Sequence, residues 1–195
     1  KDWYVKIGYY KPKNTNQKTP RYKCKLCGKS FSTHTNKSTA WQKKPEINKT
    51  KFTETALAQK VLSQDGKKIS VKDILKKHEG KIVIIDFWAS WCRDCILALP
   101  KTQKLMEDHQ EIDFVYFSVD RSMEQWKRGL DKYEISAKEN YWFDEGWKNS
   151  FNDFVELNWV PRFIVVDQRG DIANYYAISP DDPEMQITIA KLTQK

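Results

Sequence analysis

Four cysteines stand in two pairs of equal spacing, Cys24/Cys27 and Cys92/Cys95. Two residues between cysteines is the spacing of redox-active dithiols and of half of a zinc site, because both sulfurs can then face one metal ion or each other. Four cysteines in 195 residues are too few for the disulfide framework of a small secreted domain. The pairs therefore predict metal binding or thiol redox chemistry.

Cys92 follows a dense apolar run and precedes a helical pattern, so we expect it where a strand ends and a helix begins. The thiolate, not the thiol, attacks disulfides, and the unpaired N–H groups at the start of a helix favour the thiolate. Cys95 lies one helical turn further, close enough to resolve a mixed disulfide formed at Cys92. The pair predicts thiol-disulfide exchange, with Trp91 covering one side of it.

Strand and helix patterns alternate around this pair. In chain order we expect strands over 58–62, 67–71, 81–88, 113–120, 141–144, 160–167 and 171–177, and helices over 71–78, from Cys92 onward, and over 122–133, 147–157 and 183–192. Strand, helix and strand in succession predict a parallel pair. The short turn at 167–170 makes the last two strands antiparallel. We expect Leu97, Leu105 and Met106 to face the core, and His78 and His109 to face solvent.

Charge divides the chain into two parts. Residues 1–50 hold 13 Lys and Arg against two acids, a net charge of +11, whereas residues 51–195 hold 21 basic and 24 acidic residues, a net charge of −3. One basic surface rarely stops at a sequence boundary, so the distribution predicts two modules, 1–50 and 51–195. The basic module suggests an anionic partner such as nucleic acid. No run of 18 apolar residues exists, so no membrane span is expected.

The basic module begins with an aromatic strand pattern over 3–10, a polar loop over 11–20 and a return strand over 21–31 with a knuckle at its cysteines, before a linker over 32–51. Its phrase RYKCKLCGKSFS resembles the zinc ribbon of insertion-element transposases, over about residues 3–48. The resemblance implies zinc held by Cys24, Cys27 and His34 and nucleic-acid binding through residues 1–50. The family's upstream cysteine pair and helix-turn-helix are missing. A basic remnant of a fusion, without zinc, is the other interpretation.

The phrase IVIIDFWASWCRDC resembles the active site of the thioredoxin superfamily, and residues 52–195 look most like the TlpA/ResA-type thiol-disulfide oxidoreductases of the bacterial cell envelope. The resemblance implies an α/β, thioredoxin-like fold, with a mixed sheet flanked by helices. It also implies that Asp86 relays protons for Cys95. A cis bond before Pro161 would shape a substrate groove lined by Trp91 and Val160.

The same resemblance implies an enzyme that exchanges disulfides with protein substrates and a redox partner protein, without a cofactor in the redox module, in the periplasm or cell envelope. Arg93-Asp94 departs from the family's usual pair between the cysteines, and its opposite charges leave the redox potential open.

Three other functions compete with this one. The first is a zinc-ribbon protein that binds nucleic acid and carries a fused thioredoxin-like module. The second is a single zinc ion held by all four cysteines, which the 64 residues between Cys27 and Cys92 disfavour. The third is a peroxiredoxin, whose single peroxidatic cysteine stands in a different sequence context.

Overall fold

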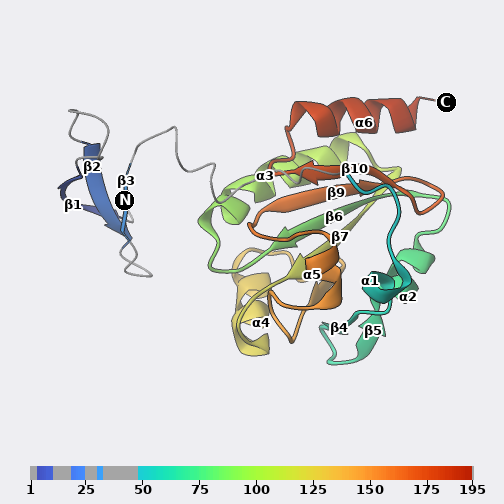
Figure 1. Cartoon of the computed structure of the whole chain (residues 1–195), viewed down its shortest axis with the longest axis horizontal. Helices are drawn as coiled ribbons and strands as arrows, with labels where there is room; N and C mark the ends of the chain where they lie inside the picture. The colour runs from blue at the N-terminus through green and yellow to red at the C-terminus, as the bar shows by residue number, and fades with distance from the viewer. Residues whose placement is uncertain (1–3, 11–18, 25–29, 33–47, 195) are drawn as a thin grey trace. The chain divides into compact units, whose positions relative to one another are not determined.

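The computed structural model describes residues 4–10, 19–24, 30–32 and 48–194 (Figure 1). Contacts between residues divide the chain into two compact units, 1–43 and 44–195. This division falls before the boundary at residue 50 that the charge distribution predicts, and that boundary stays a prediction.

The first unit holds a three-stranded antiparallel sheet in the order β1 (Tyr4–Tyr10), β2 (Thr19–Cys24), β3 (Ser30–Ser32). The strand predicted over 3–10 is confirmed over the residues described. The single return strand over 21–31 is wrong, because Lys23 pairs with Ser30 and the chain must reverse direction between Cys24 and Ser30. The predicted knuckle and most of the predicted loop lie outside the described residues.

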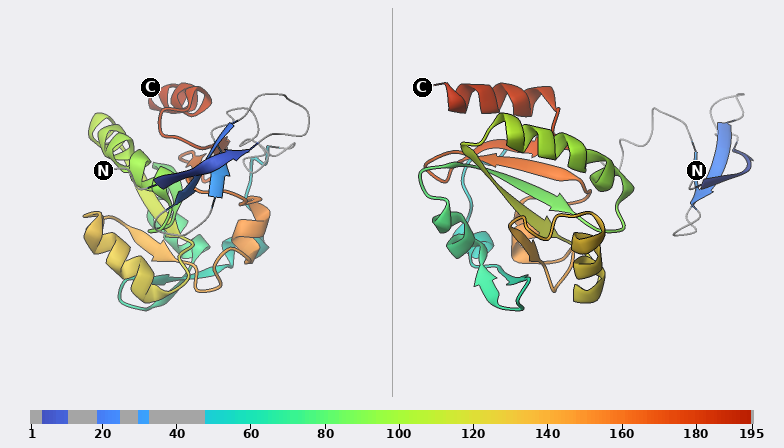
Figure 2. Two further views of the ribbon diagram at one scale, coloured as in Figure 1. Left: turned by 90° about the vertical axis from the view of Figure 1, so that its left-hand side faces the viewer. Right: turned by 180° about the vertical axis from the view of Figure 1, so that it is seen from behind.

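The second unit is built on a seven-stranded mixed sheet in the order β10-β9-β6-β7-β8-β4-β5 (Figures 1 and 2). Its elements in chain order are α1 (Glu54–Leu57), β4 (Lys60–Ser63), β5 (Lys68–Ser70), α2 (Val71–Lys77), β6 (Ile82–Trp88), α3 (Arg93–Asp108), β7 (Ile112–Ser118), α4 (Met123–Lys132), β8 (Asn140–Trp142), α5 (Ser150–Phe154), β9 (Arg162–Val166), β10 (Ile172–Ala177) and α6 (Pro183–Thr193). The predicted α/β class is confirmed, as are the parallel pair β6–β7 and the antiparallel pair β9–β10.

Strand β6 lies inside the sheet, between its parallel neighbour β7 and its antiparallel neighbour β9, and all seven of its residues are buried. Helices α3 and α6 cover one face of the sheet, and α4 and α5 lie on the other (Figures 1 and 2). Aromatic rings fill the second face, where Phe117 lies 5.9 Å from Phe87, 5.2 Å from Phe143 and 5.7 Å from Phe151 between ring centroids. In the part of the chain that is described, no helix is long and apolar enough to cross a membrane.

Helices α4 and α6 each begin at a residue whose side chain caps the helix. Ser122 accepts a hydrogen bond from the Gln125 backbone N–H, and Asp182 accepts from the second and third residues of α6, as their sequence positions predict. Helix α5 is shorter than the predicted 147–157, because Asn149 caps it and Glu156, at φ +52°, ends it. The short helix α1, capped by Thr53, was not predicted.

Leu97 does not face the core: its exposed fraction is 56%. The buried side of α3 is formed by Cys95, Ala98, Thr102 and Leu105, which recur at the spacing of one helix face. Leu97 is two residues from Cys95, so about 200° of helical rotation separates them. The prediction that Leu97 faces the core is wrong, because it rested on apolar character alone. The position of Cys95 determines which face of α3 is buried.

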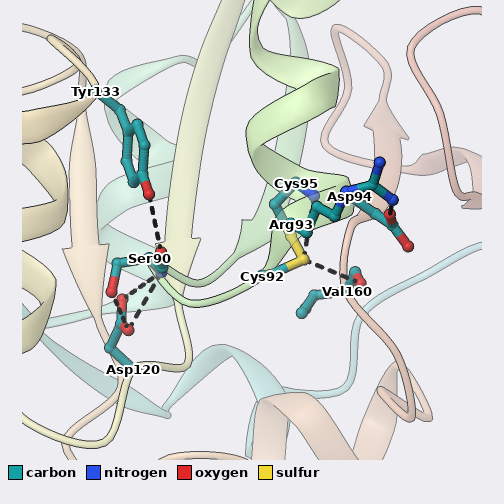
Figure 3. Close-up of a disulfide and its surroundings, with 8 residues drawn as sticks. All are labelled: Ser90, Cys92, Arg93, Asp94, Cys95, Asp120, Tyr133 and Val160. Carbon is teal, nitrogen blue, oxygen red and sulfur yellow. Dashed lines mark hydrogen bonds and ion pairs between the residues drawn. A yellow bond between two sulfur atoms is a disulfide. The ribbon is translucent and has the colours of Figure 1, made fainter. Parts of the chain in front are cut away.

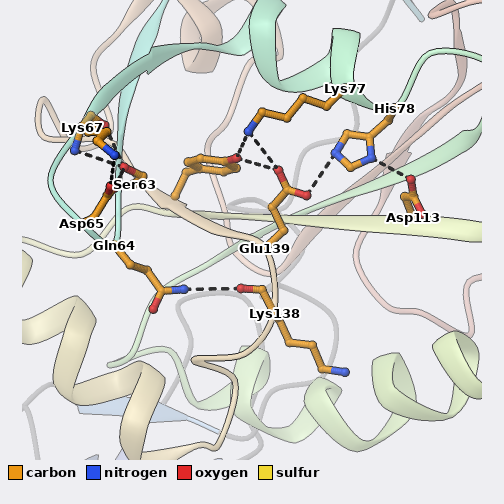
Figure 4. Close-up of polar contacts among 10 residues, drawn as sticks. Ser63, Gln64, Asp65, Lys67, Lys77, His78, Asp113, Lys138 and Glu139 are labelled. Atoms are coloured by element: carbon orange, nitrogen blue, oxygen red, sulfur yellow. Dashed lines mark hydrogen bonds and ion pairs between the residues drawn. The ribbon is translucent and has the colours of Figure 1, made fainter.

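His78 is not solvated as expected, since only 10% of its side chain is exposed (Figure 4). At the end of α2, its Nδ1 lies 2.7 Å from Asp113 Oδ2 on β7, and its Nε2 lies 3.1 Å from Glu139 Oε2. Contact with Glu139, and then with Asp113, raises the pKa of His78 above 6.5 although burial opposes the rise. Burial acts to raise the pKa of Glu139, but its contacts with His78 and Tyr141 lower it below 4.5.

We expect His78→Gln to cost about 1 kcal/mol or less of unfolding free energy at pH 6, since the site is partly exposed, and less at pH 9. A raised histidine pKa contributes stability below 6.5 that disappears as pH rises through the folded-state value. The lowered pKa of Glu139 contributes stability above 4.5 that disappears as pH falls through its own folded-state value. Urea denaturation at both pH values measures the effect. His109→Gln, which removes only a surface contact with Glu111, is the control, and an equal cost of His78→Gln at pH 6 and pH 9 would contradict the prediction.

Candidate active site

Cys92 and Cys95 form a disulfide at the start of α3 (Figure 3). Cys92 is the N-cap of this helix, with φ −84° and ψ 106°, and its Sγ accepts a hydrogen bond from the Cys95 backbone N–H at 3.1 Å. Both side chains are buried. An N-cap sulfur receives the helix's unpaired N–H groups and the positive end of its dipole, so this position favours the Cys92 thiolate when the disulfide is reduced.

The loop before β9 contacts the disulfide from a distant part of the sequence. Cys92 Sγ lies 3.4 Å from the carbonyl oxygen of Val160, 68 residues away. The Val160–Pro161 peptide bond is cis, as the resemblance implies, and both residues are buried. The structure thus brings the Val160 carbonyl to the cysteine pair, next to Pro161, and the substrate groove stays a prediction.

Asp86 lies in the middle of β6 with 3% of its surface exposed. It stands in register with Tyr116 on β7 and Phe163 on β9, so the three side chains share a face of the sheet. The Tyr116 hydroxyl lies 3.7 Å from Met106 Sδ on α3, so this face is the one covered by the cysteine-bearing helix. Asp86 Oδ1 has no hydrogen-bond partner, and burial raises the pKa of Asp86 well above 3.8.

Exposed side chains lie beside the disulfide. Trp91 is 47% exposed, and its ring centroid lies 6.4 Å from that of the half-buried Trp147. Arg93 Nη1 and Asp94 Oδ1, between the cysteines, are 4.0 Å apart, and both side chains are more than half exposed. Water screens such a pair. The buried disulfide therefore lies against a surface that combines aromatic rings with a small ion pair.

Ser90 and Asp120 were missed as site residues. Asp120 accepts hydrogen bonds from the backbone and the side chain of Ser90, two residues before Cys92. The one available signal was the acid that closes the strand phrase DFVYFSVD. The sequence pattern did not indicate that Ser90 is the partner of Asp120, because Ser90 lies 30 residues earlier.

Arg162, directly after Pro161, was also missed. Its guanidinium is buried and donates hydrogen bonds to the carbonyls of Val155 at 3.0 Å and Tyr175 at 3.2 Å, and it stacks 4.0 Å from the ring centroid of Tyr176. Burial lowers its pKa to about 10. Arg162 therefore ties the segment before the cis bond to β10.

The predicted zinc ligands of the basic module remain untested. Cys24 ends β2, and Cys27 and His34 lie outside the described residues. Within the described ranges, no three His, Cys, Asp or Glu side chains are placed to hold a metal ion. Trp88, Trp126 and Trp142 are buried core residues of the second unit.

Residues 80–172 match the family described as thioredoxin-like. Thioredoxin-like protein YneN of Bacillus subtilis is 24% identical over 119 residues, which cover 59% of this chain and 67% of YneN. Thiol-disulfide oxidoreductase ResA of Bacillus thuringiensis is 27% identical over 120 residues, 62% of this chain and 54% of ResA. The matches thus span between about half and two thirds of these relatives.

The fold is likewise similar to solved structures. A putative thiol-disulfide oxidoreductase from Bacteroides vulgatus superposes with a TM-score of 0.58 at 28% identity, covering 73% of this chain and 89% of that one. A second, from Bacteroides fragilis, has a TM-score of 0.58 at 17% identity, covers 71% of this chain and 99% of that one, and supports the fold alone. The second unit therefore has a thioredoxin-like fold, and thiol-disulfide oxidoreductases are among the proteins to which it is similar.

Proposed function

We propose that the chain exchanges disulfides with protein substrates through Cys92 and Cys95. The observation that carries the proposal is the position of the pair: Cys92 caps α3, bonded to Cys95, with the cis Val160–Pro161 loop against its sulfur. This arrangement supplies an activated nucleophile, a resolving thiol one turn away and a backbone edge beside them.

The reaction proceeds in two steps that balance. The Cys92 thiolate attacks one sulfur of a substrate disulfide, forms a mixed disulfide and releases the other substrate sulfur as a thiolate that takes up a proton. Cys95 then loses its proton and attacks Cys92 Sγ, which releases the second substrate sulfur and forms the Cys92–Cys95 disulfide. The substrate gains two electrons and two protons, and a reducing partner protein must return the electrons.

Asp86 takes the proton of Cys95 in the second step. Its carboxyl group faces the helix that carries Cys95, and its unpartnered Oδ1 has an open acceptor position. A base is most effective when its pKa is close to the operating pH, and burial moves Asp86 in that direction. The proposed substrate groove is lined by Trp91, Val160 and Pro161.

Reduction of insulin disulfides by the full chain, with dithiothreitol as the electron source, tests the proposal. The expected result is precipitation of the insulin B chain well ahead of the dithiothreitol background. A titration of Cys92/Cys95 against glutathione buffers measures the potential at the same time. A rate equal to background, in a chain whose cysteines are shown to cycle between thiol and disulfide, would overturn the proposed substrate class.

The cell envelope is the location that we propose from the resemblance to ResA-type proteins, and it accords with the ResA match. Nothing in the described residues favours nucleic-acid binding through residues 1–50, which stays a prediction. Zinc content of the purified full chain and its salt-dependent retention on DNA test that prediction.

A further inference from the structure

Ser90 is held by a carboxylate on one side (Figure 3). The two carboxylate oxygens of Asp120 accept the Ser90 backbone N–H at 3.0 and 3.2 Å, and the Ser90 hydroxyl donates to Asp120 Oδ1 at 2.7 Å. Hydrogen bonds to a charged acceptor are stronger than those between neutral groups. The carboxylate therefore holds both the backbone and the side chain of a residue that lies two positions before the proposed nucleophile.

Asp120 is itself firmly placed. The Ser118 hydroxyl donates to Asp120 Oδ2 at 2.9 Å and accepts the Asp120 N–H at 3.0 Å. The Trp142 indole N–H donates to the Asp120 carbonyl at 2.8 Å. Only 1% of Asp120 is exposed, and a buried carboxylate without partners would be costly. The end of β7 and β8 thus provide a rigid base for the contact with Ser90.

Helix α4 holds Ser90 from another direction. A Cβ added to Gly129 would lie 2.4 Å from Ser90 Cβ, so only glycine leaves room for Ser90 here. The Tyr133 hydroxyl, one turn further along, donates to the Ser90 carbonyl at 3.4 Å. Ser90 is therefore restricted in three ways. The Asp120 carboxylate accepts its hydrogen bonds, Gly129 packs closely against its Cβ, and the Tyr133 hydroxyl donates to its carbonyl.

We propose that Asp120, Gly129 and Tyr133 form a clamp on Ser90 that positions Cys92 at the start of α3. Ser90 is separated from Cys92 by Trp91 alone, and the Cys92 N–H closes a turn to the Ala89 carbonyl at 3.0 Å. A displacement of Ser90 is therefore transmitted to Cys92 and weakens the contact between its sulfur and the Cys95 N–H. The clamp residues are positioning residues, and their role in turnover rests on the proposed function.

Two variants that leave every charge in place test the clamp. Gly129→Ala adds a methyl group that pushes Ser90 away. Ser90→Gly removes the side chain with which that methyl group would collide. We expect Gly129→Ala to raise the thiol pKa of Cys92 by about one unit, which is about tenfold less thiolate below that pKa. In the double variant the added methyl group meets no Cβ at position 90. We expect its thiol pKa to equal that of Ser90→Gly alone, so the two effects are not additive.

The rate of iodoacetamide alkylation at Cys92 in the reduced full chain, followed against pH by mass spectrometry of the peptide that carries Cys92, reports this pKa, and equilibration with glutathione reports the potential. Asp167→Asn, a change at a buried turn carboxylate after the far end of β9, is the matched control and should shift neither. A Cys92 pKa in Gly129→Ala equal to wild type, or a Cys92 pKa in the double variant that differs from that of Ser90→Gly alone, would overturn the clamp. Both readouts need no turnover, so a failure to reduce insulin would count against the proposed function alone. Ser90→Ala, which keeps the backbone contacts to Asp120, provides a second, milder probe, with a smaller shift expected in the same direction.

Discussion

Cys92→Ser is expected to lose disulfide reduction, to below about a thousandth of the wild-type rate. A serine hydroxyl stays protonated at neutral pH even at the N-cap of α3, and it cannot form the disulfide that Cys92 makes with Cys95. The insulin assay measures the loss. Because a serine can still cap a helix, we expect little change in thermal stability relative to the reduced wild type.

Cys95→Ser is the matched control for this prediction. It retains the attacking sulfur but removes the resolving one, so a mixed disulfide should accumulate at Cys92, with an insulin chain when insulin is the substrate or with thionitrobenzoate when the disulfide of thionitrobenzoate is the reagent. Mass spectrometry detects the adduct. If Cys92→Ser retained turnover, or if it trapped substrate while Cys95→Ser did not, the assignment of attacker and resolver would be wrong.

Asp86→Asn is expected to lower the rate of the resolving step by about 10- to 100-fold near neutral pH and to stabilise the folded chain at the same time. The wild-type rate should fall at low pH as Asp86 is protonated and can no longer accept the proton of Cys95, and the variant should lack this dependence. Single-turnover release of substrate from the mixed disulfide, followed from pH 5 to 9, measures the step.

The gain in stability follows from the sign of the pKa shift. Burial raises the pKa of Asp86, so the folded chain binds a proton more tightly than the unfolded one, and stability falls as pH rises from about 3.8 to the folded-state value. Asparagine removes that loss, and at pH 7 we expect Tm to rise by at least about 2–4 °C, the shift that about 1 kcal/mol produces in a chain of this size.

Asp167→Asn provides the contrast. Burial acts to raise the pKa of Asp167, but hydrogen bonds from the backbones of Asp171 and Arg169 and from the Arg169 side chain lower it below 3.8. Its carboxylate therefore stabilises the folded chain at neutral pH, and the same substitution should lower Tm there and leave the resolving step unchanged. A lower Tm in Asp86→Asn as well would show that its carboxyl group makes a stabilising contact that the structure does not show.

Local patterns in the sequence predicted the order of elements well. The run from Ile82 to Trp88 is apolar enough to require burial on both faces, and the caps Ser122 and Asp182 are local signals that depend on their near neighbours alone. For the same reason the start of α3 at the cysteine pair was predictable, because it depends on a few consecutive residues.

Side-chain environments were predicted less well. His78 stands in a run of charged residues, yet β7 and the segment before β8 bring two carboxylates to its ring from 35 and 61 positions along the chain. Leu97 is apolar and yet exposed, because the helix face that packs is set by Cys95. Such outcomes depend on which elements meet, and no local periodicity records that.

The sequence by itself determined the α/β class and the cysteine pair at a strand-to-helix junction, and through resemblance it predicted the roles of Asp86 and Pro161, which stay predictions. Only the tertiary structure showed that the Val160 carbonyl lies against Cys92, that Asp86 faces the layer of α3, and that Asp120 and Gly129 hold Ser90. The physical reason is range. Caps, turns and apolar runs act between residues a few positions apart, whereas the site is completed by contacts between residues that only the packing of the sheet brings together.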